Sequence, residues 1–537
     1  MLSYAHGTSD VPLLGETIGD ALARTAARVP DSDALVSCHQ DIRLTYRELD
    51  EQVSGLARSL MAAGLEKGDR VGIWSPNRAE WKLLQYAAAR CGAILVCVNP
   101  AYRSHELEYV LNQSGAKMLV SAQAFKSSDY VEMVEKVRGN CDALERVVFL
   151  GDDWDELLSE AVSEEELDER SASLDFFDAI NIQYTSGTTG FPKGATLSHS
   201  NILNNGFFVG EGQSLTEKDR ICVPVPYYHC FGMVMGNLGA ITHGSCVVLP
   251  DEAFEPGAVL RAIQEEQCTS LYGVPTMFIG ELDHPEFESF DMSSLRTGIM
   301  AGAPCPVEVM KKVMDRMNME DVTICYGMTE TSPVSTMTGP DDDVEHRTAT
   351  VGAAMAHIEV RVADPETGKT LERGETGEFQ TRGYSVMLGY WDEPEKTAEA
   401  IDAARWMHTG DQAVMLEDGY CKIVGRIKDM IIRGGENVYP REVEEYRYKH
   451  EAVADVQVVG LPDERYGEEV CACVILREGA SVEPEELREF CKGSIAHYML
   501  PRYVLFVDEM PMKVTVKIQK FKLRDQAVEQ LGLSVPA

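Results

Sequence analysis

The stretch Tyr184-Thr-Ser-Gly-Thr-Thr-Gly-Phe-Pro-Lys-Gly-Ala-Thr-Leu-Ser-His199 decides how this chain is interpreted. It follows residues 179–183, Ala-Ile-Asn-Ile-Gln, which are typical of a buried strand. Hydroxyl side chains alternate with glycines in it, so side-chain and backbone donors stand with little steric hindrance, and Lys193 adds a positive charge. Such a loop suits a polyphosphate better than the alternative, a surface loop rich in Gly and Thr. It is not a Walker A loop, because Pro192 precedes the lysine and Gly194 follows it.

Helical and strand patterns alternate through the chain before this loop. Apolar residues recur at helical spacing over 17–28, 46–63 and 78–91, and short buried strands are expected at 69–74 and 93–98. This alternation predicts parallel sheets with crossover helices, that is, an α/β fold. Residues 151–170 hold ten acidic side chains. Because apolar residues are interspersed among them, we expect a solvated amphipathic helix or connector rather than a partner-binding tail.

A second, smaller domain is predicted after Gly425. Asp418-Gly-Tyr420 indicates a hairpin turn just before this point. The pattern that follows is strand, helix from Arg441, strands at 453–459 and 470–476, helix at 485–494 and strand at 503–507, which is enough for one α+β domain. We therefore expect domains at 1–425 and 426–537, the larger one built of parallel-sheet layers.

Composition excludes several classes of protein. The chain has 537 residues, with 49 Lys and Arg against 87 Asp and Glu, for a formal charge of −38. This charge argues against nucleic-acid binding and against electrostatic attachment to membranes. The fourteen cysteines show no zinc spacing, and the closest pair is Cys471 and Cys473. Neither a secretory signal nor an apolar run long enough to span a bilayer is apparent, so we expect a cytoplasmic protein with reduced thiols.

Five further segments, which follow the loop in order along the chain, are interpreted together with it. They are Met300-Ala-Gly-Ala-Pro304, Tyr326-Gly-Met-Thr-Glu-Thr331, Thr409-Gly-Asp411, residues 425–443 and Lys513-Val-Thr-Val-Lys-Ile-Gln-Lys-Phe-Lys-Leu-Arg524. Taken singly, each has an ordinary structural interpretation, such as a turn, a surface ion pair or a helix cap. Together they resemble the adenylate-forming (AMP-binding) enzyme superfamily over essentially the whole chain. This resemblance implies that the large domain also has a small β-barrel-like part. Residues 98–102, 228–232, 386–392 and 491–493 look most like acyl-CoA synthetase family member 2 and bacterial fatty-acid–CoA ligases.

The resemblance implies a site for ATP and Mg²⁺. Its ATP-binding residues would be Thr185, Ser186, Gly187, Thr188, Thr189, Gly190, Phe191, Pro192, Lys193, Gly302, Ala303, Pro304, Tyr326, Gly327, Met328, Thr329, Asp411, Arg426 and Lys517. Among these, the aromatic ring of Tyr326 would stack on adenine, and the Asp411 carboxylate would bind the ribose hydroxyls. The Glu330 carboxylate would hold Mg²⁺, a hard cation that bridges phosphate oxygens. Thr185, Lys193, Glu330 and Lys517 would be the catalytic residues.

The same resemblance assigns the mobile parts. Lys428 would be the hinge of the C-terminal domain, and Gly434 and Gly435 would line the route of CoA. His229 is either a core histidine or a residue of the acyl or thiol tunnel. Lys517 would neutralise the charge that develops as a carboxylate attacks the α-phosphate. Val516 departs from the family, which usually has glycine there, and this puts the geometry of the lysine loop in question rather than its chemistry.

The resemblance therefore predicts an acyl-CoA synthetase, AMP-forming, acting on medium- to long-chain fatty acids, with ATP and CoA as co-substrates. Two alternatives stay open. One is a stand-alone enzyme that adenylates an acid and loads it onto a carrier protein in trans, and the other is a luciferase-like oxygenase. A non-catalytic scaffold is disfavoured because all the expected charged residues are present. Neither the acyl chain length nor the oligomeric state follows from the sequence, although a homodimer is compatible with it.

Overall fold

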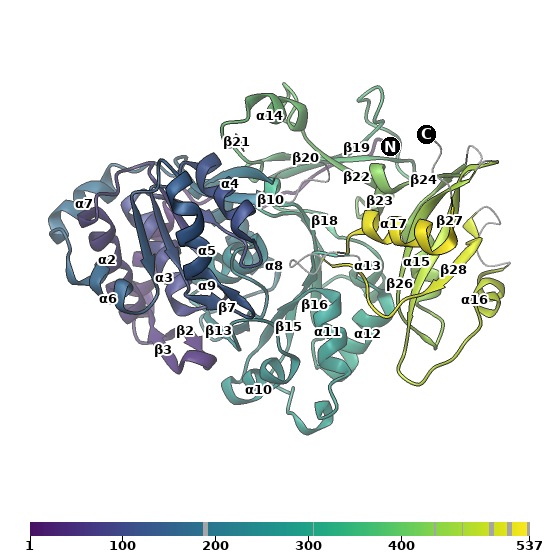
Figure 1. The fold of residues 1–537 in the computed structure, drawn as a ribbon, viewed down its shortest axis with the longest axis horizontal. Coiled ribbons are helices and arrows are strands. Elements are labelled where there is room, and N and C mark those ends of the chain that lie inside the picture. The colour runs from purple at the N-terminus through teal and green to yellow at the C-terminus, as the bar shows by residue number, and fades with distance from the viewer. Residues whose placement is uncertain are drawn as a thin grey trace.

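The computed structural model describes residues 1–185, 192–303, 305–433, 436–463, 465–492, 499–512 and 518–533. Two mainly parallel sheets and one antiparallel sheet form the larger part of the molecule. A separate mixed sheet, yellow-green at the right of Figure 1, follows from residue 431. The predicted α/β class, with parallel-sheet layers and a smaller α+β C-terminal part, is confirmed. In place of the expected small β-barrel-like part, the structure has a five-stranded antiparallel sheet.

A seven-stranded sheet carries the loop that opened the sequence analysis. Its strands, in spatial order, are β21 (Gly389–Tyr390), β11 (Lys193–Ser198), β10 (Ala179–Thr185), β5 (Ile94–Cys97), β4 (Arg70–Trp74), β6 (Met118–Ser121) and β9 (Arg146–Phe149). The strands from β10 to β9 are parallel, whereas β11 returns antiparallel to β10. The expectation that the loop extends to His199 was wrong for 193–198, because this segment pairs with β10 and β21.

A nine-stranded sheet forms the second layer. Its strands, in spatial order, are β18 (Ala353–Ala354), β17 (Val334–Met337), β16 (Asp321–Gly327), β15 (Thr297–Ala301), β14 (Ser270–Gly273), β12 (Arg220–Cys222), β13 (Cys246–Leu249), β2 (Asp33–Ser37) and β3 (Ile42–Thr45). The six strands from β16 to β2 are parallel. They bring the carboxyl ends of β15 and β16 to one edge, the place where open α/β sheets usually bind ligands.

Helices join the two large sheets into one core. They include α1 (Ile18–Arg28), α2 (Tyr46–Ala62), α3 (Ala79–Cys91), α8 (His199–Gly212) and α9 (Gly239–His243). The helix α3 contacts β4 and β5, and the Lys82 Nζ donates to the Ala34 carbonyl in β2 at 3.1 Å, so α3 lies between the layers. Thr17 and Thr45 start α1 and α2 with capping boxes. The start of α2 after Thr45 was expected, whereas Thr17 precedes its helix rather than belonging to it.

The acidic stretch forms two short helices, α6 (Asp152–Ser159) and α7 (Glu164–Ala172). Trp154, Leu157 and Leu167 are buried, while most of the acidic side chains face solvent. This agrees with the expected solvated helix. The remaining large-domain helices are α4 (Ser104–Ser114), α5 (Tyr130–Val137), α10 (Pro256–Glu266), α11 (Pro275–Leu282), α12 (Val307–Arg316), α13 (Val344–Ala349) and α14 (Pro394–Ala400).

The antiparallel sheet has the order β1 (Tyr4–His6), β19 (Ile358–Ala363), β20 (Thr376–Gly383), β22 (Met407–Met415) and β23 (Cys421–Arg426). The predicted hairpin at Asp418-Gly-Tyr420 joins its last two strands. The mixed sheet that follows contains β24 (Ile431–Arg433), β25 (Glu436–Val438), β26 (Val453–Asp463), β27 (Gly467–Leu476) and β28 (Tyr503–Phe506), with α15 (Pro440–Arg447), α16 (Pro484–Cys491) and α17 (Lys520–Leu531). Buried apolar residues 18–421 form one cluster, and those of 431–527 form two others.

Candidate active site

The predicted site residues gather where central strands of both large sheets end. Thr185 is the last residue of β10, and Tyr326 and Gly327 end β16. Glu330 follows three residues later in a single turn of 3₁₀-helix. Residues distant in sequence therefore lie at one edge, because crossover connections between parallel strands bring their carboxyl ends to the same side of a sheet.

Glu330 is the centre of a first polar cluster. Its side chain is 5% exposed, and Oε1 accepts hydrogen bonds from the Tyr390 hydroxyl at 2.8 Å and from Thr185 Oγ1 at 3.4 Å. The Lys193 Nζ lies 4.8 Å from the centroid of the Tyr390 ring, within cation–π range. A carboxylate, a hydroxyl and an ammonium thus converge. Three residues that the sequence predicted separately, Thr185, Lys193 and Glu330, are brought together here.

Tyr390 is a member of this cluster that sequence reasoning missed. Tyr390 belongs to β21 and pairs with Ala195 of β11. Lys193 is the first residue of β11, so this strand pairing brings Lys193 and Tyr390 close together. Burial, and then the neighbouring Glu330 carboxylate, raise the pKa of Tyr390, so the phenol stays protonated and can donate. Tyr390 lies within residues 386–392, a segment that indicated only a family resemblance.

A second cluster joins Tyr326, Asp411 and Arg426. The Tyr326 hydroxyl donates to Asp411 Oδ2 at 2.7 Å, and Arg426 Nε lies 3.1 Å from Asp411 Oδ1. Asp411 and Arg426 are directly opposite in the antiparallel pair β22–β23, so the strand register sets their ion pair. Burial, followed by the Asp411 charge, raises the pKa of Tyr326, and the Asp411 charge raises the pKa of Arg426. Three more predicted residues therefore form a unit.

Backbone conformation explains the small residues nearby. Gly302 follows β15 with φ +85°, a conformation that residues with a side chain rarely adopt. A Cβ on Gly327 would lie 1.9 Å from the Pro333 carbonyl oxygen, so only glycine fits there. Ala303 is exposed beside Gly302, and Met328 and Thr329 lead into the turn of Glu330. Of the predicted glycines that the structure describes, Gly302 is thus favoured by its positive φ and Gly327 is required by close packing.

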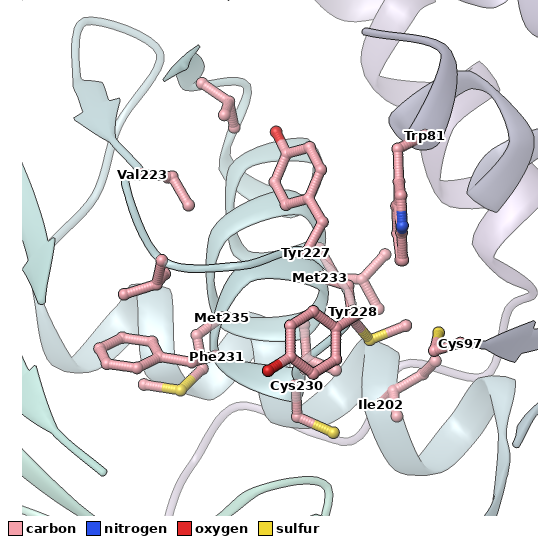
Figure 2. Close-up of a cluster of buried hydrophobic side chains, with 14 of the residues drawn as sticks. Trp81, Cys97, Ile202, Val223, Tyr227, Tyr228, Cys230, Phe231, Met233 and Met235 are labelled. Atoms are coloured by element: carbon pink, nitrogen blue, oxygen red, sulfur yellow. The ribbon is translucent and has the colours of Figure 1, made fainter. Parts of the chain in front are cut away.

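His229 opens a hydrophobic wall next to the site. The backbone N–H of Phe231 donates to its Nδ1 at 3.1 Å, at the start of a π-helix over Phe231–Leu238. Figure 2 shows the buried side chains of this region, with Tyr228, Cys230 and Met233 close together. The Cys230 thiol contacts the Thr329 side chain and is close to Glu330, which connects this apolar wall to the first cluster. A π-helix of this kind is frequent at functional sites, and sequence periodicity gave no signal for it.

Several predicted residues lie outside the described residues. They are Ser186, Gly187, Thr188, Thr189, Gly190, Phe191, Pro304, Gly434, Gly435 and Lys517. Pro192 directly precedes β11 and its carbonyl accepts from the Tyr109 hydroxyl at 3.1 Å. Lys428 lies in a single 3₁₀ turn, Ile427–Asp429, between the antiparallel sheet and the C-terminal sheet. This turn is the point at which the chain passes from one core to the other.

Comparison with known families matches two parts of the chain. Residues 22–391 match the family described as AMP-binding enzyme, and residues 442–517 match the AMP-binding enzyme C-terminal domain. The putative acyl-CoA synthetase YngI of Bacillus subtilis (strain 168) is 47% identical, with 97% of this chain and 99% of the relative covered. Human medium-chain acyl-CoA ligase ACSF2, mitochondrial, is 44% identical over 99% of this chain and 91% of its own length.

Solved structures agree with the whole architecture. The anthranilate CoA ligase AuaEII in complex with anthranoyl-AMP superposes with a TM-score of 0.86 at 28% identity, over 98% of this chain and 99% of that one. ATP-bound MatB from Rhodopseudomonas palustris has a TM-score of 0.81 at 30% identity, over 95% of this chain and 98% of that one. Both matches extend through the smaller C-terminal part.

Proposed function

The chain belongs to the AMP-binding enzyme family, and on that premise we propose a two-step reaction at the edge described above. The enzyme is an ATP-dependent acyl-CoA synthetase that works through an acyl-adenylate. A substrate carboxylate attacks the α-phosphorus of ATP, a P–O bond forms, and pyrophosphate leaves. CoA thiolate then attacks the acyl carbon, and AMP leaves. The observation that supports this best is the convergence of Thr185, Lys193 and Glu330 at one sheet edge.

The first cluster suits the polyphosphate. Lys193 supplies a cation and Thr185 a hydroxyl at the start of the Gly/Thr loop, so both can contact phosphate oxygens. Among the described residues, both side-chain donors to Glu330 contact one carboxylate oxygen, Oε1, and we assign Oε2 to a cation. One carboxylate and a hydroxyl fit Mg²⁺, which usually takes one or two carboxylates together with substrate phosphates. When bound there, Mg²⁺ would reduce the negative charge on the phosphates.

The second cluster suits the nucleoside. The Asp411 carboxylate can accept from two ribose hydroxyls, and its contacts with Tyr326 and Arg426 fix its orientation. The ring of Tyr326 packs edge-on against Phe379 at 5.0 Å, which restrains the ring that would face adenine. Gly302 and Ala303 leave room for the base beside the backbone. The two clusters would thus hold opposite ends of one ATP molecule.

The two half-reactions need different groups, and we assign them to the two domains. Lys517 would neutralise charge in the adenylation step only, and Gly434 and Gly435 would line the CoA route in the second step. We place the domain boundary after Gly425, with Lys428 as the hinge. The separation of the apolar clusters at residues 421 and 431 supports this boundary. Rotation about a short hinge is an established way of exchanging catalytic groups over one substrate.

We infer that the acid is a fatty acid of medium to long chain. The support is the apolar wall of Figure 2, which borders Glu330 through Cys230 and carries no charged side chain among its labelled residues. His229 lies at its start and is placed on the acyl or thiol route. One relative named above, human ACSF2, is by its name a medium-chain acyl-CoA ligase. Substrates with an apolar tail would gain affinity with each buried CH₂, at about 0.8 kcal/mol.

A ladder of straight-chain carboxylic acids tests the proposal. With ATP, Mg²⁺ and CoA, we expect AMP and CoA thioester to form in equal amounts, with kcat/KM rising and then levelling as the chain fills the pocket. Release of AMP without CoA consumption would indicate a carrier protein as acceptor, and oxygen uptake would indicate an oxygenase. Lys517→Ala should abolish pyrophosphate exchange and spare thioester formation from supplied acyl-AMP. An equal loss in both steps would contradict the division of labour.

We also propose a cellular compartment and an oligomeric state for the enzyme. All fourteen cysteines are free and thirteen are buried, which supports a reducing compartment such as the cytoplasm. No helix in the described ranges is long and apolar enough to cross a membrane. We also propose a homodimer, which a solution mass of twice 59.4 kDa would establish.

A further inference from the structure

The C-terminal domain buries three ionisable side chains among its described residues, and one of them has no partner. Glu444 accepts a bond from Lys520 Nζ at 2.6 Å, and Glu469 accepts two from the Arg433 guanidinium at 2.7 and 3.0 Å. Arg447 is 0% exposed, yet none of its three guanidinium nitrogens makes a hydrogen bond. Two of the three buried charges are therefore compensated and the third is not.

An unpaired buried guanidinium is costly, because desolvation is not offset by a counter-charge. The groups that act on Arg447 electrostatically are the thiols of Cys471 and Cys491 and the like-charged Arg488. No carboxylate is among them. Of these thiols, Cys471 lies on β27, and its same-side neighbour Cys473 interacts with Lys520.

Cys471 and Cys473 form a sulfur pair. They are two residues apart on β27, so both point to the same side, and both belong to the cluster under α17 with Leu523 and Ala527. Their side chains interact. Same-side residues of a strand are about 6.7 Å apart at Cα, near the upper limit of about 6.8 Å for a disulfide. A metal ion between the two sulfurs needs a longer separation, since each metal–sulfur bond is about 2.3 Å.

A cavity reaches Cys473, one member of this pair, from the surface. It has a volume of about 430 Å³ and is lined by Cys473, Phe506, Asp508 and Glu509, with residues of α17 on its other side. The two carboxylates give the cavity a negative rim, which attracts cations and repels anionic thiol reagents. The pair is thus buried but is approached at Cys473 through a space that favours a positive ion.

We propose that Cys471 and Cys473 bind one soft monovalent metal ion, such as Cu(I), in two-coordinate geometry, with Arg447 offsetting the charge of the complex. Two thiols and one M⁺ give an S–M–S unit of charge −1, and two protons leave, with no change in oxidation state. Thiolates are the ligands that Cu(I) prefers. The groups of three or more metal-binding side chains that would form a larger site are absent from the described residues, so a two-coordinate ion is the form that fits. The proposal does not depend on the enzymatic reaction.

The test is a titration of the reduced full-length protein with Cu(I) in competition with bicinchoninate, under argon. The wild type should bind one more tight equivalent than the double variant C471S/C473S. Cys491→Ser is the matched control, because Cys491 is also buried and near Arg447 but is not on the strand pair; it should keep the tight equivalent. Equal binding by the wild type and C471S/C473S would overturn the site.

The role of Arg447 has its own test, based on charge. A divalent ion such as Hg(II) gives a neutral complex with two thiolates, so the guanidinium should matter little to it. Arg447→Met should therefore weaken Cu(I) binding at least tenfold and change Hg(II) binding less than twofold, while Arg447→Lys should keep most of the Cu(I) affinity. Equal weakening for both ions would overturn the charge-compensating role and would indicate that Arg447 acts only through packing. Thermal melting of each variant would establish that it is folded.

Discussion

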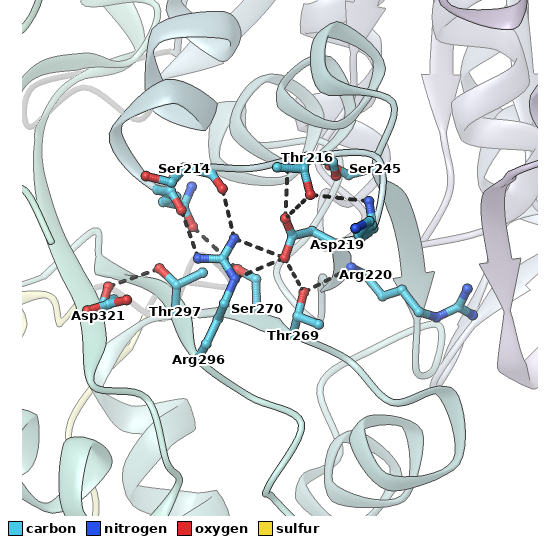
Figure 3. Close-up of polar contacts among 12 residues, drawn as sticks. Ser214, Thr216, Asp219, Arg220, Ser245, Thr269, Ser270, Arg296, Thr297 and Asp321 are labelled. Carbon is cyan, nitrogen blue, oxygen red and sulfur yellow. Dashed lines mark hydrogen bonds and ion pairs between the residues drawn. The ribbon is translucent and has the colours of Figure 1, made fainter. Parts of the chain in front are cut away.

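The two edges of the nine-stranded sheet use polar residues in opposite ways. At the amino edge, Asp219, Thr269 and Arg296 each stand immediately before a parallel strand and bind one another. Asp219 accepts from Thr216, Thr269 and Arg296, and Arg296 also donates to the carbonyls of Gln213 and Ser214, as Figure 3 shows. This network uses its hydrogen-bonding groups internally.

At the carboxyl edge, by contrast, the corresponding groups are only partly used by the protein. Among the described residues, Glu330 receives two side-chain donors on one oxygen, and Lys193, at the start of β11 in the neighbouring seven-stranded sheet, lies over the ring of Tyr390. A satisfied network holds the strands in place, whereas a partly satisfied one can bind a ligand. The internally bonded network lies before β12, β14 and β15, whereas the proposed chemistry lies after β16, at the opposite edge of the sheet. Substitutions at the amino edge should therefore lower the free energy of unfolding, whereas substitutions at the carboxyl edge should lower the activity.

The largest effect should follow Asp219→Ala. This substitution leaves Arg296 without its carboxylate partner and removes two threonine contacts. We expect the free energy of unfolding to fall by about 3 kcal/mol. This is the low end of the range for a buried ion pair, because about a third of the Arg296 side chain is exposed. Urea denaturation measures this fall, with the exposed Asp168→Ala as the control. The folded fraction should keep normal kcat/KM. A loss of activity with unchanged stability would contradict the separation of the two edges.

Glu330→Gln should have the next largest effect, on activity. Loss of the carboxylate should lower the rate of adenylate formation about 100-fold, equivalent to about 2.7 kcal/mol, and raise the Mg²⁺ concentration required. Pyrophosphate exchange at several Mg²⁺ concentrations measures both. The exposed Glu345→Gln is the control. If the rate fell without any change in Mg²⁺ dependence, Glu330 would not be a metal ligand.

Asp411→Asn keeps the size of the side chain and removes its charge. The Tyr326 and Arg426 contacts should weaken, and KM for ATP should rise about tenfold, or about 1.4 kcal/mol, with kcat changed less. Steady-state kinetics over a range of ATP concentrations provide the measurement. A fall in kcat at unchanged KM would instead place Asp411 in the chemical step.

Tyr390→Phe should give the smallest effect, because it removes one hydrogen bond to Glu330 and keeps the ring under Lys193. The cost of such a bond is about 1 kcal/mol, so adenylation should slow about fivefold. Tyr420→Phe, which removes a tyrosine contact with Asp342 away from the site, is the matched control and should leave the rate unchanged. Equal effects of the two substitutions would remove Tyr390 from the site.

Local signals made the helices and strands around the site predictable. Thr45 before an apolar helical pattern fixed the start of α2, and alternating short apolar runs gave β4 and β5. Thr185, Lys193, Glu330, Tyr326, Asp411 and Arg426 were identified by resemblance, and the structure gathers them into two clusters. Residue type and order were sufficient for that identification, because the loop chemistry is local.

Contacts between distant segments were not predictable in this way. Nothing in the sequence pairs Tyr390 with Glu330, Asp219 with Arg296, or Asp411 with Arg426, since each contact depends on strand order or register. The π-helix after Cys230 likewise has no periodic signal of its own. Burial without a partner, as at Arg447, can be recognised only when all the neighbours are in place.

The sequence by itself therefore determined the class of fold, because hydrophobic periodicity acts over a few residues, and its motifs identified the family by resemblance. The phosphate-binding role of the Gly/Thr loop stays a prediction. Only the tertiary structure decided which charges meet, which are left uncompensated, and that Cys473, which shares a cluster with Cys471, lines a cavity. The physical reason is that electrostatic and hydrogen-bond energies depend on distances in space, and the crossover connections of parallel sheets make those distances independent of separation along the chain.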